Sequence, residues 1–188
     1  MFHVLRRQVH RNFRKPLIIM SPKSMLRNKL CVSTIDEFTE QVFRPALDDP
    51  SPIDRSKVRR VLLCSGKVYY DLFSARSERE IDDVAIVRLE QLYPFPLKEL
   101  HEILATYPST AEVFWVQEEP KNMGPWRFIS DRNFMIFDDG RELTYVGRDS
   151  AASPAVGSYR KHMAELRSLL DGALRETKVA NLRKSHVS

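Results

Sequence analysis

The sequence predicts an α/β domain, a three-layer arrangement in which a mainly parallel sheet is flanked by helices. From position 57 onward, short apolar runs of strand length alternate with amphipathic stretches of about ten residues, a pattern typical of parallel sheets. The chain has 188 residues, of which 43% are apolar, and this is enough for one domain with a buried core. Internal repeats and low-complexity tracts are absent from the sequence.

Four segments have the composition of buried strands. The clearest is Val58–Ser65, an apolar run that stops at a glycine, and Cys64 within it is expected to be a small core residue. The other three segments are Asp83–Leu92, Ala111–Gln117 and Leu143–Val146. Asp138-Asp139-Gly140 is expected to form a turn before the last of them.

Helices are expected in the intervals between these strands. The first covers Val68–Ser77, and Pro96 suits the first turn of the second, where the N–H that proline lacks has no partner in any helix. One face of that second helix holds Leu97, Leu100, Ile103 and Leu104. The third helix covers Trp126–Met135, with core candidates Phe128, Ile129 and Phe134. The last covers Ser158–Leu174, with inward residues Tyr159, Met163, Leu166, Leu169 and Leu170.

The chain before position 57 is less regular. Leu17–Met20 has the composition of a short buried strand. Ser33 or Thr34 is placed to cap a short helix beginning near Ile35, whose first turn holds two acidic residues. Residues 48–52 contain two prolines and two aspartates, the composition of a linker.

Charge is divided unevenly along the chain, whose net charge is +5. Residues 1–35 hold eight basic residues and no acid, and residues 175–188 hold four basic residues and one glutamate. Between them, residues 36–174 hold eighteen basic and twenty-four acidic residues. A nucleic-acid-binding domain carries its basic surface on the folded part, so this distribution argues against a nucleic-acid partner. No uncharged apolar run reaches 18 residues, which argues against a membrane-spanning segment.

The sequence offers no set of catalytic residues. The five histidines lack HExxH or similar spacing, and Cys31 and Cys64 lie far apart, so neither a metal site nor a disulfide framework is expected. A GxGxxG motif for a dinucleotide is absent. Glu118 and Glu119 are adjacent at a strand end and should point to opposite sides, which is unsuitable for a paired acid and base. We therefore expect no catalytic, cofactor-binding or metal-binding residue in this chain.

Two other features at strand ends have more than one reading. Ser65-Gly66-Lys67 could hold an anion through backbone N–H groups and the helix dipole, or could be an ordinary tight turn with a solvated lysine. Large aromatic residues also gather at or just after the strand ends, where they suit either the core or a protein interface. They are Tyr69, Tyr70, Tyr93, Phe95, Trp115 and Trp126. If the Tyr93–Pro96 and Trp126 regions are exposed, the isolated domain should self-associate.

Taken together, four segments are more specific than any single motif. They are Leu62–Leu72, Arg88–Pro96, Val116–Trp126, and Tyr145–Arg148 with Ser153–Gly157. In this order and spacing they resemble the C-terminal domain of the 2-oxoglutarate dehydrogenase E1 component, a thiamine-diphosphate-dependent enzyme whose C-terminal domain is transketolase C-terminal-like. The opening segments Phe2–Gln8 and Arg14–Ser24 resemble the end of that family's preceding pyrimidine-binding domain.

The resemblance implies a division of the chain. Residues 1–30 would be the end of a pyrimidine-binding-type domain or a connecting segment, and residues 31–56 a linker region with a short helix. Residues 57–174 would be the C-terminal α/β domain, and residues 175–188 a basic tail expected to be disordered. The arginine-rich opening, which has some features of a mitochondrial transit peptide, would then be interior sequence.

The resemblance also implies where the chemistry lies. Thiamine diphosphate and magnesium would be held by upstream domains of an intact enzyme, and this chain would support the dimer and the packing around them. Its partners would be the remaining E1 domains, a second E1 subunit, and the E2 and E3 components. The compartment would be the mitochondrial matrix in a eukaryote and the cytoplasm in a bacterium. Some relatives are regulated by acetyl-CoA, and our candidates for an anion site are Lys23, Arg27, Ser65, Lys67 and Arg88.

Three classes of function stay open from the sequence. The chain could be part of an E1 enzyme that oxidatively decarboxylates 2-oxoglutarate, or its close analogue 2-oxoadipate. It could instead be a free-standing, non-catalytic relative that binds an E1 partner or a regulatory nucleotide. The third class, a basic-ended adaptor unrelated to metabolism, fits the acidic body less well.

Overall fold

A five-stranded sheet forms the centre of the computed structural model, which describes residues 2–137 and 140–174. The strand order is β1-β3-β2-β4-β5. Strands β2, β3, β4 and β5 run parallel to their neighbours, whereas β1 pairs with β3 in the antiparallel direction. The strands are β1 Ala46–Leu47, β2 Arg60–Cys64, β3 Val84–Leu89, β4 Glu112–Pro120 and β5 Leu143–Arg148.

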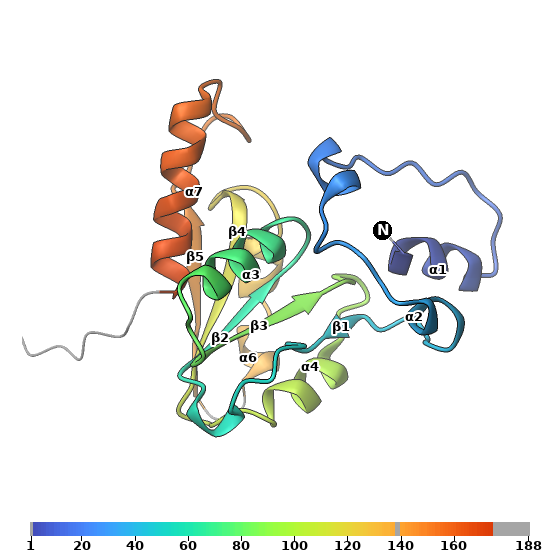
Figure 1. Cartoon of the computed structure of the whole chain (residues 1–188), viewed down its shortest axis with the longest axis horizontal. Helices are drawn as coiled ribbons and strands as arrows, with labels where there is room; N and C mark the ends of the chain where they lie inside the picture. Colours follow the sequence, from blue (N-terminus) through green and yellow to red (C-terminus); the bar gives the residue numbers. More distant parts are fainter. Residues whose placement is uncertain (1, 138–139, 175–188) are drawn as a thin grey trace, which may run out of the picture.

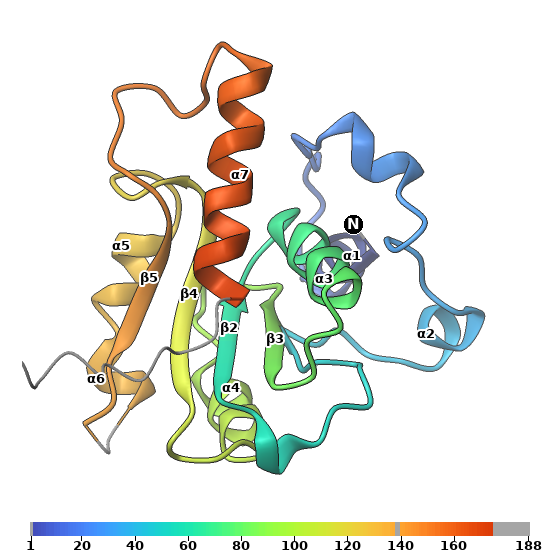
Figure 2. The same ribbon diagram turned by 60° about the vertical axis from the view of Figure 1, so that its left-hand side comes forward.

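Helices cover both faces of the sheet, as the alternating pattern predicted (Figures 1 and 2). Helices α3 (Val68–Glu78) and α7 (Tyr159–Leu174) touch each other on one face. Helices α4 (Leu97–Leu104), α5 (Trp126–Ser130) and α6 (Asn133–Ile136) lie on the other. The remaining elements are α1 Phe2–His10, α2 Ile35–Thr39, and the 3-10 helices η1 Lys23–Arg27 and η2 Arg55–Lys57. None of the helices within the described ranges is long and apolar enough to cross a membrane.

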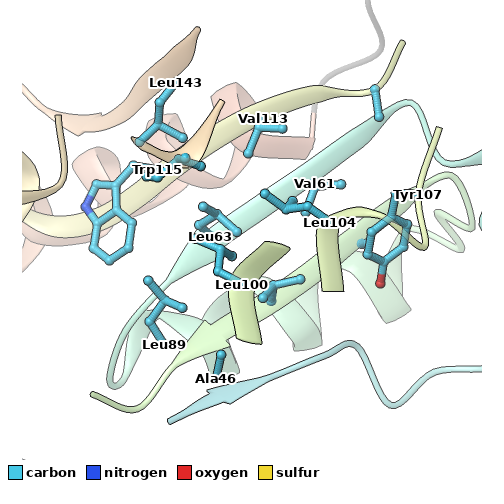
Figure 3. Packing of buried hydrophobic residues seen from close by; sticks show 14 of the residues in the cluster. Ala46, Val61, Leu63, Leu89, Leu100, Leu104, Tyr107, Val113, Trp115 and Leu143 are labelled. Carbon is cyan, nitrogen blue, oxygen red and sulfur yellow. The ribbon is translucent and has the colours of Figure 1, made fainter. Parts of the chain in front are cut away.

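Alternating residues of the central strand β2 supply the two cores. Leu63 pairs in register with Val87 of β3 and Trp115 of β4, and its side chain belongs to the cluster covered by α4, α5 and α6. Figure 3 shows this cluster, in which Leu63 and Trp115 lie above Leu100 of α4. Leu62 and Cys64 point to the other face, where they pack with Val68 and Leu72 of α3 and with Leu169 of α7. All four predicted strands and the core position of Cys64 are confirmed.

Two helical predictions need correction. The segment 126–135 is not one helix: α5 ends at Ser130 and α6 restarts at Asn133. This break turns Phe134 outward, so the predicted core residue is 76% exposed, whereas Ile129 is fully buried as expected. In α7 the predicted inward residues Tyr159 and Met163 are also exposed, because the first turns of the helix rise past the ends of the strands (Figure 1).

The segment before the sheet, residues 4–45, contains no buried residue and is called the arm below. It lies beyond the β1–β3 side of the sheet in both views (Figures 1 and 2). The predicted strand Leu17–Met20 is wrong, since these residues pair with no other strand of the described chain and Ile18 and Met20 are largely exposed. An apolar run becomes a strand only where a neighbouring strand can accept its backbone hydrogen bonds.

The short helix of the arm begins as its sequence predicts. The Thr34 hydroxyl accepts a hydrogen bond from Glu37 N at 3.3 Å, and the Glu37 carboxylate accepts one from Thr34 N at 2.8 Å. This reciprocal pair is a capping box, which satisfies two backbone donors at the start of α2. Thr34, of the two candidates, is therefore the cap.

Strand β1 was not predicted, because two residues of a strand carry too little periodicity to detect. Ala46 and Leu47 are buried, and they pair with Leu89 and Arg88 of β3. Burial in the described chain therefore starts at Ala46, before the proline-rich stretch 48–52.

Candidate functional site at the carboxyl edge of the sheet

Ligands of open parallel sheets bind outside the carboxyl ends of the strands, and four strands of this sheet end at one edge. Each strand end there carries charged groups. Lys67 follows β2, Arg88 and Glu90 close β3, Glu118 and Glu119 lie near the end of β4, and Arg148 ends β5. Of these groups, the sequence indicated the Ser65-Gly66-Lys67 turn after β2 as a possible anion-binding turn.

Lys67 is already engaged by two carboxylates. The turn before it depends on Gly66, whose φ of +75° favours glycine. The Lys67 ammonium bonds the Asp71 carboxylate one helical turn later and lies 3.2 Å from Glu118. Burial lowers the pKa of Lys67, but the bond to Asp71 and the charge of Glu118 outweigh it, so the pKa lies above its ordinary value. The positive charge of Lys67 is therefore already compensated by two carboxylates, which weakens its attraction for an added anion.

Arg88 lies on the next strand, opposite Cys64 in register, and is held by aromatic rings and an acid. Its guanidinium lies 4.4 Å from the centroid of the Tyr69 ring, and Nε lies 2.7 Å from Glu90 Oε1. Its Nη1 donates to the Tyr70 hydroxyl at 3.2 Å. Packing on an aromatic face combined with an ion pair fixes a guanidinium in one orientation.

Tyr70 also connects the arm to the sheet. Its hydroxyl donates to the Cys31 thiol at 3.1 Å. Burial and this bond to Cys31 raise the pKa of Tyr70 to about 12. Hydroxyl and guanidinium therefore keep one protonation state over the ordinary pH range, and the contact between arm and body does not depend on their titration.

The five residues predicted for an anion site are only partly brought together. Ser65, Lys67 and Arg88 follow or close the neighbouring strands β2 and β3 at one edge of the sheet. Lys23 and Arg27 lie at the two ends of η1 in the arm, exposed to solvent. An acetyl-CoA site made from these residues stays a prediction.

Sequence reasoning missed the main polar residue of this edge, Gln117. It is buried at 2% exposure, and its Oε1 accepts from Trp115 Nε1 and from Trp126 N, both at 2.9 Å. Its Nε2 donates to Met123 O at 2.7 Å. The Gln117 side chain thus bonds to several parts of the turn after β4. Gly124 lies in this turn, and a Cβ added to it would lie only 3.0 Å from Glu119 Cβ. The sequence signal that could have identified Gln117 is its position as a polar residue directly after the apolar run 113–116.

Glu118 and Glu119 both line one cavity, although strict alternation predicted opposite directions for them. The register between β4 and β5 shifts between Val116 and Pro120, so strict alternation is lost in this part of β4. The cavity has a volume of about 260 Å³ and lies between this turn, the segment around Pro154 and helix α7. Arg148 at the end of β5 contributes to its wall and pairs with Glu165 of α7 at 2.6 Å.

Acids compensate the three cations Lys67, Arg88 and Arg148 at this edge of the described chain. Within 2–137 and 140–174, no group of three or more histidine, cysteine, aspartate or glutamate side chains is placed to hold a metal ion. Lys67, Arg88 and Arg148 are paired with acids, which leaves no free cation among them for a diphosphate.

Comparisons with known proteins give the relationship of the chain. The family model described as 2-oxoglutarate dehydrogenase C-terminal matches residues 32–174. The 2-oxoglutarate dehydrogenase E1 component of Cupriavidus necator is 49% identical over 177 residues, which are 94% of this chain and 19% of that protein. The E1 component of Rickettsia felis is 51% identical, over 92% of this chain and 18% of its own length. The chain thus spans about a fifth of the length of these relatives.

A solved structure gives a weaker likeness. It is described as a split-gene transketolase, inactive β4 tetramer, and is 15% identical, with a TM-score of 0.48, over 72% of this chain and 43% of that one. The α/β assignment is established by the strand pairing described above and does not depend on this likeness. Because the family model covers most of the chain, and the sheet and helices are those its motifs predicted, this chain belongs to the 2-oxoglutarate dehydrogenase C-terminal family.

Proposed function

We propose that this chain serves as the C-terminal, non-catalytic part of a 2-oxoglutarate dehydrogenase E1, where it completes the folded enzyme and supports its dimer. The observation that supports this proposal is the exposed apolar surface of the arm. It has no buried residue, yet most of the exposed large hydrophobic side chains of the described chain belong to it. They are Leu5, Val9, Phe13, Leu17, Ile18, Ile19, Met20, Leu26, Leu30, Val32, Ile35, Phe38 and Val42.

An apolar segment of this kind is typical of an interface, because soluble proteins rarely leave a large contiguous apolar surface in water. The arm also holds nine basic residues against three acids. The body, in contrast, has both faces of its sheet covered by helices and two filled cores. The apolar surface that still lacks a covering partner is therefore mainly that of the arm. In the intact enzyme, residues 1–30 would pack within a preceding pyrimidine-binding-type domain.

In this proposal the chemistry belongs to segments that the relatives have beyond the fifth that this chain spans. Thiamine diphosphate, with magnesium, would supply the carbanion chemistry of oxidative decarboxylation, and the protein would supply orientation and electrostatics. The substrate would be 2-oxoglutarate or the longer 2-oxoadipate. The E2 and E3 components would be further partners.

Reconstitution tests the proposal. The chain would be co-expressed with the Cupriavidus necator E1 component lacking its matched 177 residues, and reduction of ferricyanide by 2-oxoglutarate would be measured with thiamine diphosphate and magnesium. We expect co-purification and activity from the pair, and no activity from this chain alone. Turnover by the chain alone would contradict the non-catalytic role. Tight binding to an intact E1 instead would favour the free-standing relative.

A pair of matched variants identifies the arm as the contact. Ile18→Glu places a charge on an arm side chain that is 84% exposed, and Lys98→Glu changes an equally exposed side chain on α4. We expect Ile18→Glu to abolish co-purification and Lys98→Glu to preserve it. Equal behaviour of the two variants would remove the arm from the interface.

A further inference from the structure

We propose that the cavity between the turn after β4 and helix α7 receives an arginine or lysine side chain of a partner protein. With a volume of about 260 Å³, the cavity is smaller than the range of about 300–1,000 Å³ typical of pockets for drug-sized ligands. A single long side chain is the better match. This inference does not depend on the proposed function, since it concerns only residues of the folded body.

One carboxylate in the wall of this cavity is uncompensated. Glu118 is paired with Lys67 at 3.2 Å, and Glu165 is paired with Arg148 at 2.6 Å. The half-buried carboxylate of Glu119 makes no hydrogen bond or ion pair with any residue of the described chain. Among the described residues that line the wall, Arg148 is the only arginine and is engaged by Glu165, whereas the carboxylate of Glu119 is left without a cation.

The rest of the wall suits an aliphatic stem. Leu166 and Leu169 of α7 form one side, and Pro154 and Ala155 of the segment between β5 and α7 form another. Leu169 is buried at 4% exposure and also packs in the core under α7, so this side is rigid. Arginine and lysine bury their methylene stems along apolar surface while the charged head meets an acid, which is the combination found here.

Charge complementarity favours a cation as the occupant of the cavity over an anion or a neutral group. An anion would meet three carboxylates in the wall, against one guanidinium that Glu165 occupies and the solvent-exposed imidazole of His162. A neutral apolar group would leave Glu119 partly desolvated without a partner, which is unfavourable. A basic side chain satisfies the carboxylate and covers the apolar wall at once.

The test uses the full chain and small probes in a titration followed by ¹⁵N–¹H NMR spectra. Nα-acetyl-arginine methylamide is compared with Nα-acetyl-citrulline methylamide, which has nearly the same shape without the charge. We expect saturable shifts at residues 119, 166 and 169 with a Kd on the order of millimolar. The citrulline probe should bind about threefold to fivefold more weakly.

Glu119→Gln is the matched variant, since the carboxylate has no hydrogen bond to another described residue that the change would remove. Glu102→Gln on α4, across the sheet from the cavity, is the control. We expect Glu119→Gln to bind both probes equally weakly and Glu102→Gln to behave as the original chain. Raising the salt to 0.5 M should reduce the preference for arginine without any substitution. Equal binding of arginine and citrulline to the unmodified chain, or arginine binding that survives Glu119→Gln, would overturn the proposal.

Discussion

Arg76 of α3 and Asp49 of the proline-rich stretch form an ion pair that is almost completely removed from water, with side chains 5% and 1% exposed. Further bonds satisfy both groups. Arg76 Nη1 donates to Val84 O at 2.9 Å, and Asp49 Oδ2 accepts from Ile86 N at 2.6 Å. The pair therefore joins the stretch predicted as a linker to a helix and to strand β3.

Removing one partner of this pair should strongly destabilise the body. For Arg76→Leu we expect a loss of about 3–5 kcal/mol in the free energy of unfolding, because the Asp49 charge stays buried without compensation. Urea denaturation followed by circular dichroism measures it. Arg79→Leu is the control, since Arg79 forms an exposed pair with Asp171 and should cost less than about 1 kcal/mol. Similar losses in both variants would show that the buried pair has no special role.

The two cysteines should differ in reactivity. Burial raises the pKa of the Cys64 thiol from 9.0 to about 12, whereas Cys31 is partly exposed. We expect one thiol of the folded chain to react with Ellman's reagent at pH 8, and Cys31→Ser to abolish that reaction. Two fast-reacting thiols in the folded chain would contradict the burial of Cys64.

Cys64 should also contribute to the alkaline limit of stability. A thiol whose pKa is raised by folding stays protonated in the native state, while the unfolded chain releases its proton above pH 9. The stability that it contributes is therefore complete below about pH 9 and is lost as the pH rises toward 12. Urea midpoints between pH 8 and pH 11 should fall less steeply for Cys64→Ala than for the unmodified chain. If the urea midpoints of the two proteins fell equally with pH, the titration of Cys64 would not be a cause of the alkaline loss of stability.

Binding of acetyl-CoA tests the predicted anion site. Calorimetric titration of the chain with Lys67→Ala and Arg88→Ala would measure it, and binding unaffected by both substitutions would remove these residues from any such site. We expect the Arg88 substitution to have the larger effect on folding, because Arg88 packs on Tyr69 and bonds Tyr70. Thermal melts of both variants separate the two effects.

The isolated chain should self-associate, but through a different surface from the one the sequence indicated. Trp126 packs against Tyr145 with ring centroids 5.1 Å apart and is only partly exposed, whereas Tyr93 is exposed as expected. The arm exposes far more apolar surface than either. In sedimentation velocity, we expect Ile18→Glu with Met20→Glu to reduce association more than Tyr93→Ser. A monomer at high concentration would contradict both surfaces.

The sequence by itself determined the order of strands and helices from β2 onward, apart from the break between α5 and α6, together with the core role of Cys64 and a helix cap at Ser33 or Thr34. Each of these depends on local spacing or on a residue's immediate neighbours, and such signals are complete within a window of about ten residues. The motif series likewise indicated the family.

Only the tertiary structure decided the rest. Whether Leu17–Met20 forms a strand depends on a partner strand, and the outward direction of Phe134 depends on where a helix breaks. The Asp49–Arg76 pair, the network around Gln117 and the uncompensated charge of Glu119 each join groups from separate elements. Contacts of this kind depend on how the elements pack and on which charges are removed from water, and neither can be seen along the chain.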